Sequence, residues 1–173
     1  FGLGFFPKSE INLVNAKVNL RKFWTFSRRW YFAGGFTGRI VNTENQPYFL
    51  NSGIGYGRDF VRGYEYYVVD GQVFGLVKSD LKFALIPQQV STIKFIPTDK
   101  FNKIPWAVYL SIYSDMGYVN WTVTNGNTLH STALLGYGVG VILVTFYDIV
   151  FMVEFSFIQM GENGIFIHFN ASI

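Results

Sequence analysis

Apolar and polar residues alternate with a period of two along most of this sequence. In the segment 133–145, for example, Leu135 and Val139 fall on one face, and Gly136 and Gly138 fall on the other. This alternation is typical of β-strands that have one apolar and one polar face. We predict about eight strands, at 1–6, 10–26, 29–41, 73–86, 104–116, 133–145, 147–159 and 164–173.

Two environments produce such strands: a soluble β-sandwich and a transmembrane barrel with an apolar outer face and a polar lumen. Strand length favours the barrel, because soluble strands average about 5–6 residues and tilted membrane strands need about 9–11. Aromatic residues near strand ends would form an interfacial girdle: Trp24, Phe26, Trp30 and Trp106. We therefore predict an all-β fold, a transmembrane antiparallel β-barrel.

The uncharged stretch 133–147 could also form a transmembrane helix. It is shorter than the about 18 apolar residues that such a helix usually requires. It also alternates with a period of two, so we predict a strand there.

Short and long connections alternate along the chain, as in outer-membrane barrels with periplasmic turns and extracellular loops. The short ones include Ser27-Arg28 and Gly161-Glu162-Asn163, and the long ones are 42–72, 87–103 and 117–132. A barrel of about eight strands fills its lumen with its own side chains. It would leave no room for the longest loop, so we expect part of a larger barrel.

The segment 42–72 is polar and rich in glycine. Loops longer than about 12–15 residues are usually functional or disordered. Its aromatic content argues against disorder: Tyr48, Phe49, Tyr56, Phe60, Tyr64, Tyr66 and Tyr67. We predict that this loop packs inside the barrel.

Composition supports a membrane protein. Half of the 173 residues are hydrophobic and only 14% are charged, whereas soluble domains have about a quarter charged. No cysteine is present, and the net charge of +3 is dispersed over the strands, so we expect no disulfides and no nucleic-acid partner. We interpret 1–173 as a fragment, with any signal peptide upstream of Phe1.

Three motifs occur in order: Val61-Arg62-Gly63-Tyr64, Tyr113-Ser114-Asp115-Met116-Gly117, and Gly164-Ile165-Phe166-Ile167-His168-Phe169. Together they resemble motifs of the outer-membrane assembly and translocation barrels, the BamA and TamA type. In that superfamily the first is the tip of the sixth extracellular loop, which folds into the lumen. The second is a strand element whose acid faces the lumen, and the third is the terminal-strand signal, here Gly164, Ile167 and Phe169.

The resemblance implies that 1–173 is the C-terminal half of a barrel of about sixteen strands, with 42–72 inserted in the lumen. The chain departs from the family pattern by ending in Ile173 instead of an aromatic residue. Neither the N-terminal strands nor periplasmic POTRA repeats are in this chain. The tyrosine-rich segment 63–72 resembles Bacteroidota versions of the family.

Arg62 requires acceptors if it lies in a lumen, because its guanidinium always stays charged. Carboxylates give the strongest and most directional hydrogen bonds to it. The period-two pattern places Asp115, Asp80 and Glu154 on lumen-facing positions. We expect Asp115 to be the first partner and Asp80 the second, with Gly63 allowing a tight backbone and Tyr64 packing on the wall. The alternative is a solvated loop arginine.

No residue pattern indicates catalysis, a cofactor or a metal. Gly136, Gly138 and Gly140 lack the strand–turn–helix context of a nucleotide loop. His130 and His168 are too few and too scattered to predict a metal site. No nucleophile–base pair stands out, so we do not expect an enzyme.

The expected function is that of a BamA-like factor in the bacterial outer membrane, which inserts and folds outer-membrane proteins. An unpaired strand edge can template an incoming strand, and 164–173 would be that edge. The implied partners are outer-membrane lipids, nascent outer-membrane β-barrel proteins, and accessory lipoproteins or assembly-complex subunits. The alternatives are a translocation or secretion barrel of the same superfamily, and a passive porin-type channel.

Overall fold

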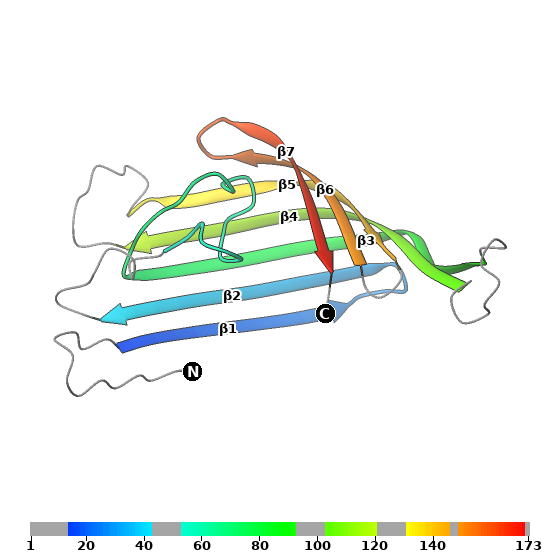
Figure 1. The fold of residues 1–173 in the computed structure, drawn as a ribbon, viewed down its shortest axis with the longest axis horizontal. Helices are drawn as coiled ribbons and strands as arrows, with labels where there is room; N and C mark the ends of the chain where they lie inside the picture. The colour runs from blue at the N-terminus through cyan, green and yellow to red at the C-terminus, as the bar shows by residue number, and fades with distance from the viewer. Residues whose placement is uncertain (1–13, 43–52, 93–102, 121–130, 146–148, 172–173) are drawn as a thin grey trace.

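The computed structural model describes residues 14–42, 53–92, 103–120, 131–145 and 149–171. The seven strands in these ranges form one antiparallel sheet in the order β1-β2-β3-β4-β5-β6-β7 (Figure 1). They are β1 (Val14–Thr25), β2 (Trp30–Asn42), β3 (Val73–Thr92), β4 (Lys103–Asn120), β5 (Ala133–Val144), β6 (Ile149–Ile158) and β7 (Asn163–Ala171).

The prediction of an all-β, antiparallel fold is confirmed. The described residues contain no helix, and therefore none that is long and apolar enough to cross a membrane. Across these residues the sheet is open, with β1 and β7 as its two edges. The predicted strand 1–6 lies outside the described residues.

One face of the curved sheet is apolar and exposed. The strand registers bring Leu20, Phe36, Val77, Met116 and Leu135 side by side across β1 to β5. These side chains are between 38% and 61% exposed. Soluble monomers rarely expose a contiguous apolar surface of this kind. Strand pairing thus extends the alternation predicted for each strand into a continuous apolar surface.

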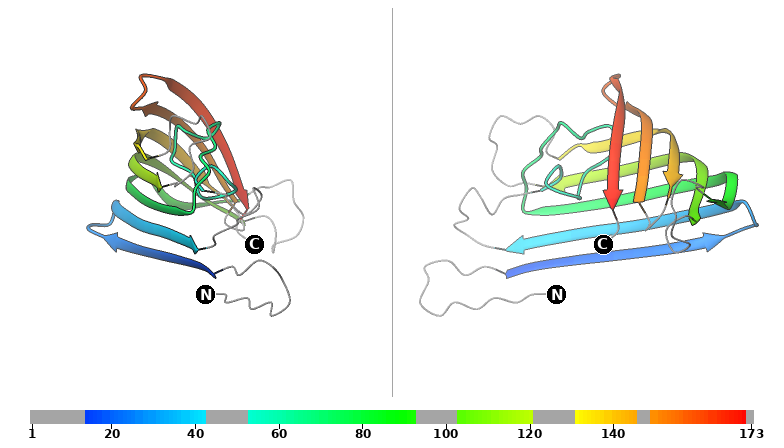
Figure 2. Two further views of the ribbon diagram at one scale, coloured as in Figure 1. Left: turned by 90° about the vertical axis from the view of Figure 1, so that its left-hand side faces the viewer. Right: turned by 45° about the vertical axis from the view of Figure 1, so that its right-hand side comes forward.

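The opposite, concave face is polar and is covered by part of the chain itself. The described part of the long connection, residues 53–72, lies across this face (Figure 2). It forms the main hydrophobic core with inward-facing strand residues. The buried members of this core are Ile54, Val61, Tyr64, Val69, Phe74, Leu76, Val119, Leu134 and Ile158. Residues 43–52 lie outside the described residues.

Two glycines of the sheet allow the connection to lie directly on the strands. A Cβ atom on Gly136 of β5 would be 2.0 Å from the carbonyl oxygen of Arg62. A Cβ atom on Gly117 of β4 would be 2.6 Å from Cγ2 of Val61. Any other residue at these positions would push the loop away from the sheet.

Two strands extend further than the sequence predicts. β3 continues to Thr92 and β4 to Asn120, whereas the alternation indicated ends near 86 and 116. In β3 the register shifts between Ala84 and Ile86 and again between Ile86 and Gln89. Pro87 lies in the second shift, where its missing N–H removes no regular ladder bond. The proline therefore interrupts the register without ending the strand.

The predicted alternation of short and long connections is wrong as a description of the two ends of the sheet. Successive strands are antiparallel, so the end of β3 and the start of β4, between which ten residues intervene, lie at the same end of the sheet as the short turn 26–29. The short turn 159–162 lies at the opposite end, where β2 and β4 end and β3 and β5 begin. Connection length thus does not separate the two ends.

Candidate functional site

Arg62 lies at the centre of the contact between the 53–72 segment and the concave face. Its Nε and Nη2 atoms donate to the two carboxylate oxygens of Asp115, at 2.8 and 2.7 Å. Its backbone N–H donates to the same carboxylate at 3.2 Å. The side chain of Asp115 is fully buried. This two-pronged arrangement is the strongest geometry for an arginine–carboxylate pair.

Three further groups complete the surroundings of the guanidinium. Nη1 donates to Oε1 of Glu154 at 3.3 Å, and Nη2 donates to the carbonyl oxygen of Ser79 at 3.1 Å. The guanidinium carbon lies 3.8 Å from the centre of the Tyr113 ring, close enough for a cation–π interaction. Arg62 is therefore surrounded by acceptors and by an aromatic face.

Asp80 is a weaker partner of Arg62 than expected. Its Oδ2 lies 3.6 Å from Nη1 of Arg62 and 3.5 Å from Nζ of Lys82. Its Oδ1 accepts a hydrogen bond from the Ser111 hydroxyl at 2.6 Å. Glu154, not Asp80, is the second partner, because Asp80 is already held by Ser111 and Lys82. We call Arg62, Asp115, Glu154 and Asp80 the Arg62 cluster.

Burial and charge act in opposite directions on Arg62. Burial alone would lower the pKa of its guanidinium, but the hydrogen bond and the charge of Asp115 raise that pKa, and the net direction is upward. The arginine therefore remains a permanent cation. The charge of Arg62 therefore does not change with pH.

The other residues of the first motif have distinct local roles. Gly63 adopts a φ of 93°, and a Cβ atom there would lie 2.6 Å from Cγ2 of Ile158. This conformation and this contact both require glycine. Tyr64 is buried in the hydrophobic core, and so is Val61. The residues that precede and follow Arg62 in the sequence thus fix its backbone against the sheet.

A second group of charged residues lies where the connection meets the last two strands. Nε2 of His168 is 3.0 Å from Oε1 of Glu65 and 3.2 Å from Oε2 of Glu154. These distances are short enough for ion pairs, yet none of the three buried atoms has a hydrogen-bond partner among the described residues. Burial raises the pKa of the Glu65 carboxyl. We call Glu65, Glu154 and His168 the His168 cluster.

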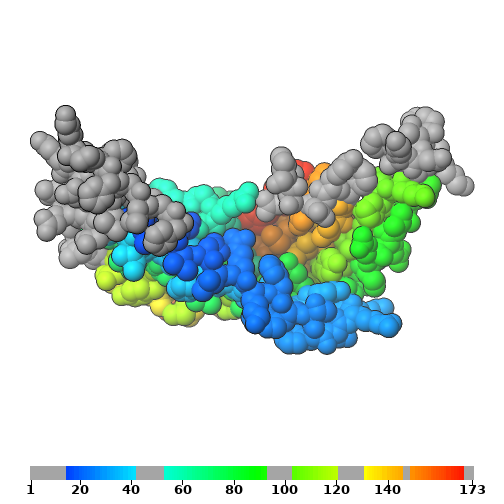
Figure 3. Space-filling model, turned by 90° about the horizontal axis from the view of Figure 1, so that it is seen from below, coloured from blue at the N-terminus to red at the C-terminus, as the bar shows by residue number. Residues whose placement is uncertain are grey.

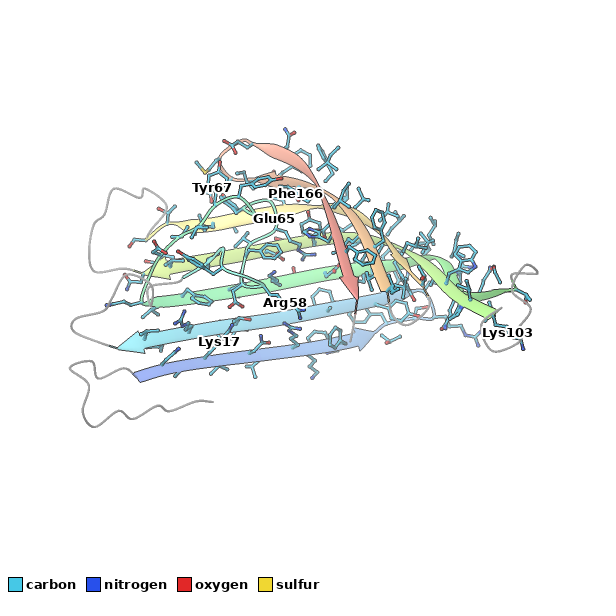
Figure 4. The ribbon with its side chains drawn as sticks, viewed as in Figure 1. Lys17, Arg58, Glu65, Tyr67, Lys103 and Phe166 are labelled. Carbon is cyan, nitrogen blue, oxygen red and sulfur yellow. The ribbon has the colours of Figure 1, made fainter. Side chains whose placement is uncertain are left out.

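Aromatic contacts fix the same part of the connection against β7. The rings of Tyr66 and Phe166 lie 5.8 Å apart, and those of Phe60 and His168 lie 6.2 Å apart. Figure 4 shows Glu65 on the connection near Phe166. The space-filling view shows the connection beside β6 and β7 (Figure 3). The connection therefore contacts the edge of the sheet as well as its centre.

Residues of the third motif lie at that edge. Ile167 and Phe169 of β7 are 65% and 70% exposed on the apolar face. Gly164 pairs with Ser156 in the register of β6 and β7. Ile173 lies outside the described residues. The first motif thus contacts the second directly through Arg62 and Asp115. Of the third motif, Phe166 and His168 contact the connection, whereas Ile167 and Phe169 face away from it.

Sequence reasoning missed Glu65 and dismissed His168. A signal for the histidine was nevertheless present, because His168 and Glu154 fall on the same polar face of neighbouring predicted strands. In the observed register His168 is opposite Met152, two residues from Glu154, and such diagonal neighbours are within reach of long side chains. No comparable pattern marked Glu65, because the fold of a long connection does not follow from periodicity.

Comparisons with known proteins identify no relative of this chain. No family model, no curated protein and no solved structure matches this chain. Inferences about function therefore rest on the residues and the geometry described above.

Proposed function

We propose that this chain forms part of the wall of a transmembrane β-barrel in a bacterial outer membrane. The exposed apolar face supports this proposal, because lipid would cover side chains such as Ile112 and Val139, which are 59% and 51% exposed. The strands contain between 9 and 20 residues, and about 9–11 are needed for a tilted strand to cross a bilayer. In such a barrel, the concave face would line the lumen.

Within that barrel, we propose the function of a BamA-like assembly factor that inserts and folds outer-membrane proteins. One observation carries this proposal: Arg62 of the first motif binds Asp115 of the second in a buried, two-pronged pair. These motifs are 53 residues apart, and each resembles a separate element of the assembly and translocation barrels. Their direct contact supports a shared role that neither short motif supports by itself.

The proposed mechanism uses the edge strand β7 as a template. An edge strand presents unpaired N–H and C=O groups, to which an incoming strand can add by hydrogen bonding. The exposed side chains Ile165, Ile167 and Phe169 would contact lipid together with the added strand. Apolar burial and backbone pairing would drive insertion without a nucleotide. Accessory lipoproteins or complex subunits are proposed as further partners.

A cysteine cross-linking scan of the full-length protein tests the template proposal. The chain has no cysteine, so single cysteines at Ile165, Ile167 and Phe169 add the only thiols to this region. Nascent barrel proteins that carry a cysteine in their own last strand should form disulfides with these positions. Val139 and Val141 of β5 are matched controls, because they lie on the same apolar face away from the edges. If the β7 positions never cross-link, the template proposal is wrong.

A passive channel is the second candidate, and one observation favours it. A cavity of about 320 Å³ lies between one side of the connection and the sheet. Its lining contains the basic residues Arg21, Arg58, Arg62 and Lys78 and the acidic residues Asp59, Asp80 and Glu154. This small excess of basic residues would favour anions. Planar-bilayer recordings of the full-length protein distinguish the two functions. Steady, anion-selective conductance with the 53–72 segment intact would support the channel, and a closed pore would support the assembly factor.

A further inference from the structure

We propose that Glu65, Glu154 and His168 bind a divalent transition-metal cation, with Zn²⁺ as the natural probe. The ligands would be Oε1 of Glu65, Oε2 of Glu154 and Nε2 of His168. These three atoms lie within 4.8 Å of one another. This site goes beyond the proposed function and does not depend on it.

The spacing of the three atoms fits a metal ion. Zinc binds imidazole nitrogen and carboxylate oxygen at about 2.0–2.2 Å in a tetrahedral arrangement, which places neighbouring ligand atoms about 3.3–3.5 Å apart. Nε2 of His168 is 3.0 Å from Glu65 and 3.2 Å from Glu154. The two carboxylate oxygens lie within 4.8 Å of each other, so small movements of the side chains would bring all three atoms to this spacing.

The ion pairs of His168 with Glu65 and Glu154 lack well-aligned hydrogen bonds. A protonated His168 would donate its Nε2–H to one of the two carboxylates, along the direction of the N–H bond. Neither contact has that geometry, and Glu65 Oε1, Glu154 Oε2 and His168 Nε2 are all buried without a hydrogen bond. Such buried polar atoms normally have a partner. A cation at their point of convergence would satisfy all three lone pairs at once.

The surrounding cations are shared between several carboxylates. Arg62 is engaged in the two-pronged pair with Asp115 and reaches only the other oxygen of Glu154, Oε1. Lys78 adds one positive charge near Glu65, and its Nζ lies 4.3 Å from the centre of the Phe60 ring. A divalent cation would neutralise the two negative charges of Glu65 and Glu154.

The surroundings also leave room for further ligands. Glu154 and His168 line the cavity of about 320 Å³ between the connection and the sheet. Water from this cavity would fill the coordination positions that the protein does not supply, as in open zinc sites. Phe60 lies against the imidazole with its ring tilted by only 23° and so restricts its orientation.

A bound ion would join three separate elements of the fold. Glu65 belongs to the 53–72 connection, Glu154 to β6 and His168 to β7. The ion would therefore fix the connection to the edge strand. Metal binding would add a cross-link between these elements that the aromatic contacts alone do not provide.

Zinc titration calorimetry of the full-length protein, stripped of metal with a chelator and held in detergent, tests the proposal. We expect one ion per chain that is lost in His168→Gln. Glu65→Gln should weaken binding by about tenfold or more, since even outer-sphere changes weaken metal sites by about 10–100-fold. Replacement of zinc by Co²⁺ should give a visible absorption band in the parent protein and none in His168→Gln.

His130→Gln is the matched control, because the sequence contains two histidines, His130 and His168, and the cluster defined among the described residues contains His168. Its zinc stoichiometry should equal that of the parent protein. Unchanged binding in His168→Gln, or no binding in the parent, would overturn the proposal. Far-UV circular dichroism checks the β-structure of each variant. Should His168→Gln fail to fold, Glu65→Gln decides, because Glu65 lies outside the strands.

Discussion

Glu154 belongs to both the Arg62 cluster and the His168 cluster, and its two carboxylate oxygens differ in their hydrogen bonding. In the Arg62 cluster its Oε1 accepts a hydrogen bond from Arg62, which also binds Asp115 with good geometry. In the His168 cluster its Oε2 has a neighbour at 3.2 Å but no hydrogen bond. The first cluster has aligned hydrogen bonds between protein groups, and the second has three buried polar atoms close together without an aligned hydrogen bond. The first is therefore suited to holding the fold, and the second to binding a cation.

The largest effect is expected when the central cation of the Arg62 cluster is removed. Arg62→Ala leaves the buried Asp115 and Glu154 unpaired, so unfolding should become easier by about 3–5 kcal/mol. The 53–72 segment should also become sensitive to protease, while the strands still form. Urea unfolding and limited proteolysis measure the two effects.

The lysine variant of the same residue provides the control for charge. Arg62→Lys keeps the positive charge but loses the two-pronged geometry. It should recover only part of the lost stability. Full recovery of stability in Arg62→Lys would show that charge alone matters. If Arg62→Ala were as resistant to protease as the parent protein, the role of the cluster would be contradicted.

The two aspartates of the Arg62 cluster should differ in their effect. Asp115→Asn breaks the two-pronged pair in a fully buried position and should lower the free energy of unfolding by about 2–3 kcal/mol. Asp80→Asn should change it by less than about 1 kcal/mol, because Asp80 lies 3.6 Å from Arg62 and an amide can still bond to Ser111. Urea unfolding of the two variants under identical conditions tests this order. Equal losses would show that the 2.7 Å contact is no more important than the 3.6 Å contact.

The close approach of the connection to β5 should also be measurable. Gly136→Ala places a methyl group against the carbonyl oxygen of Arg62 and should lower the free energy of unfolding by about 1–3 kcal/mol. Gly35→Ala is the matched control on the concave face, because its nearest neighbour would be 3.7 Å away. Thermal unfolding distinguishes the two. If both variants lost similar amounts of stability, the effect would come from the strands themselves and not from the contact between Gly136 and Arg62.

The smallest effect is expected in the His168 cluster without metal. His168→Gln in the presence of a chelator should change the free energy of unfolding by less than about 1 kcal/mol, because Nε2 of His168 forms no hydrogen bond. With zinc present, the parent should gain stability that the variant does not. Urea unfolding with and without zinc tests this. A large loss in the chelated state would show that His168 already acts as a protein-only ion pair.

The strands and their two faces were largely predictable from the sequence. The alternation in 104–116 placed Ser111, Tyr113 and Asp115 on the polar face, and all three are buried there. It failed at the ends of β3, because Pro87 resembles a strand terminator and only the register shift shows that pairing continues. Periodicity describes which way side chains point, but not how far pairing extends.

The carboxylates near Arg62 were also predictable as a set, but their order was not. Asp80, Asp115 and Glu154 all lie on the polar face, and the structure brings all three to the guanidinium. Their ranking depends on competing neighbours such as Ser111, which hydrogen-bonds Asp80. Those neighbours follow from the registers of several strands at once.

The sequence by itself determined where most strands lie, which side chains share a face, and which residues are available to pair with Arg62, because these depend on a local period of two. Only the tertiary structure decided that Glu65 meets His168, 103 residues away by their numbering. That contact requires the path of a long connection, which depends on where Gly63, Gly117 and Gly136 permit close packing. Such long-range packing has no local period, so no pattern along the chain records it.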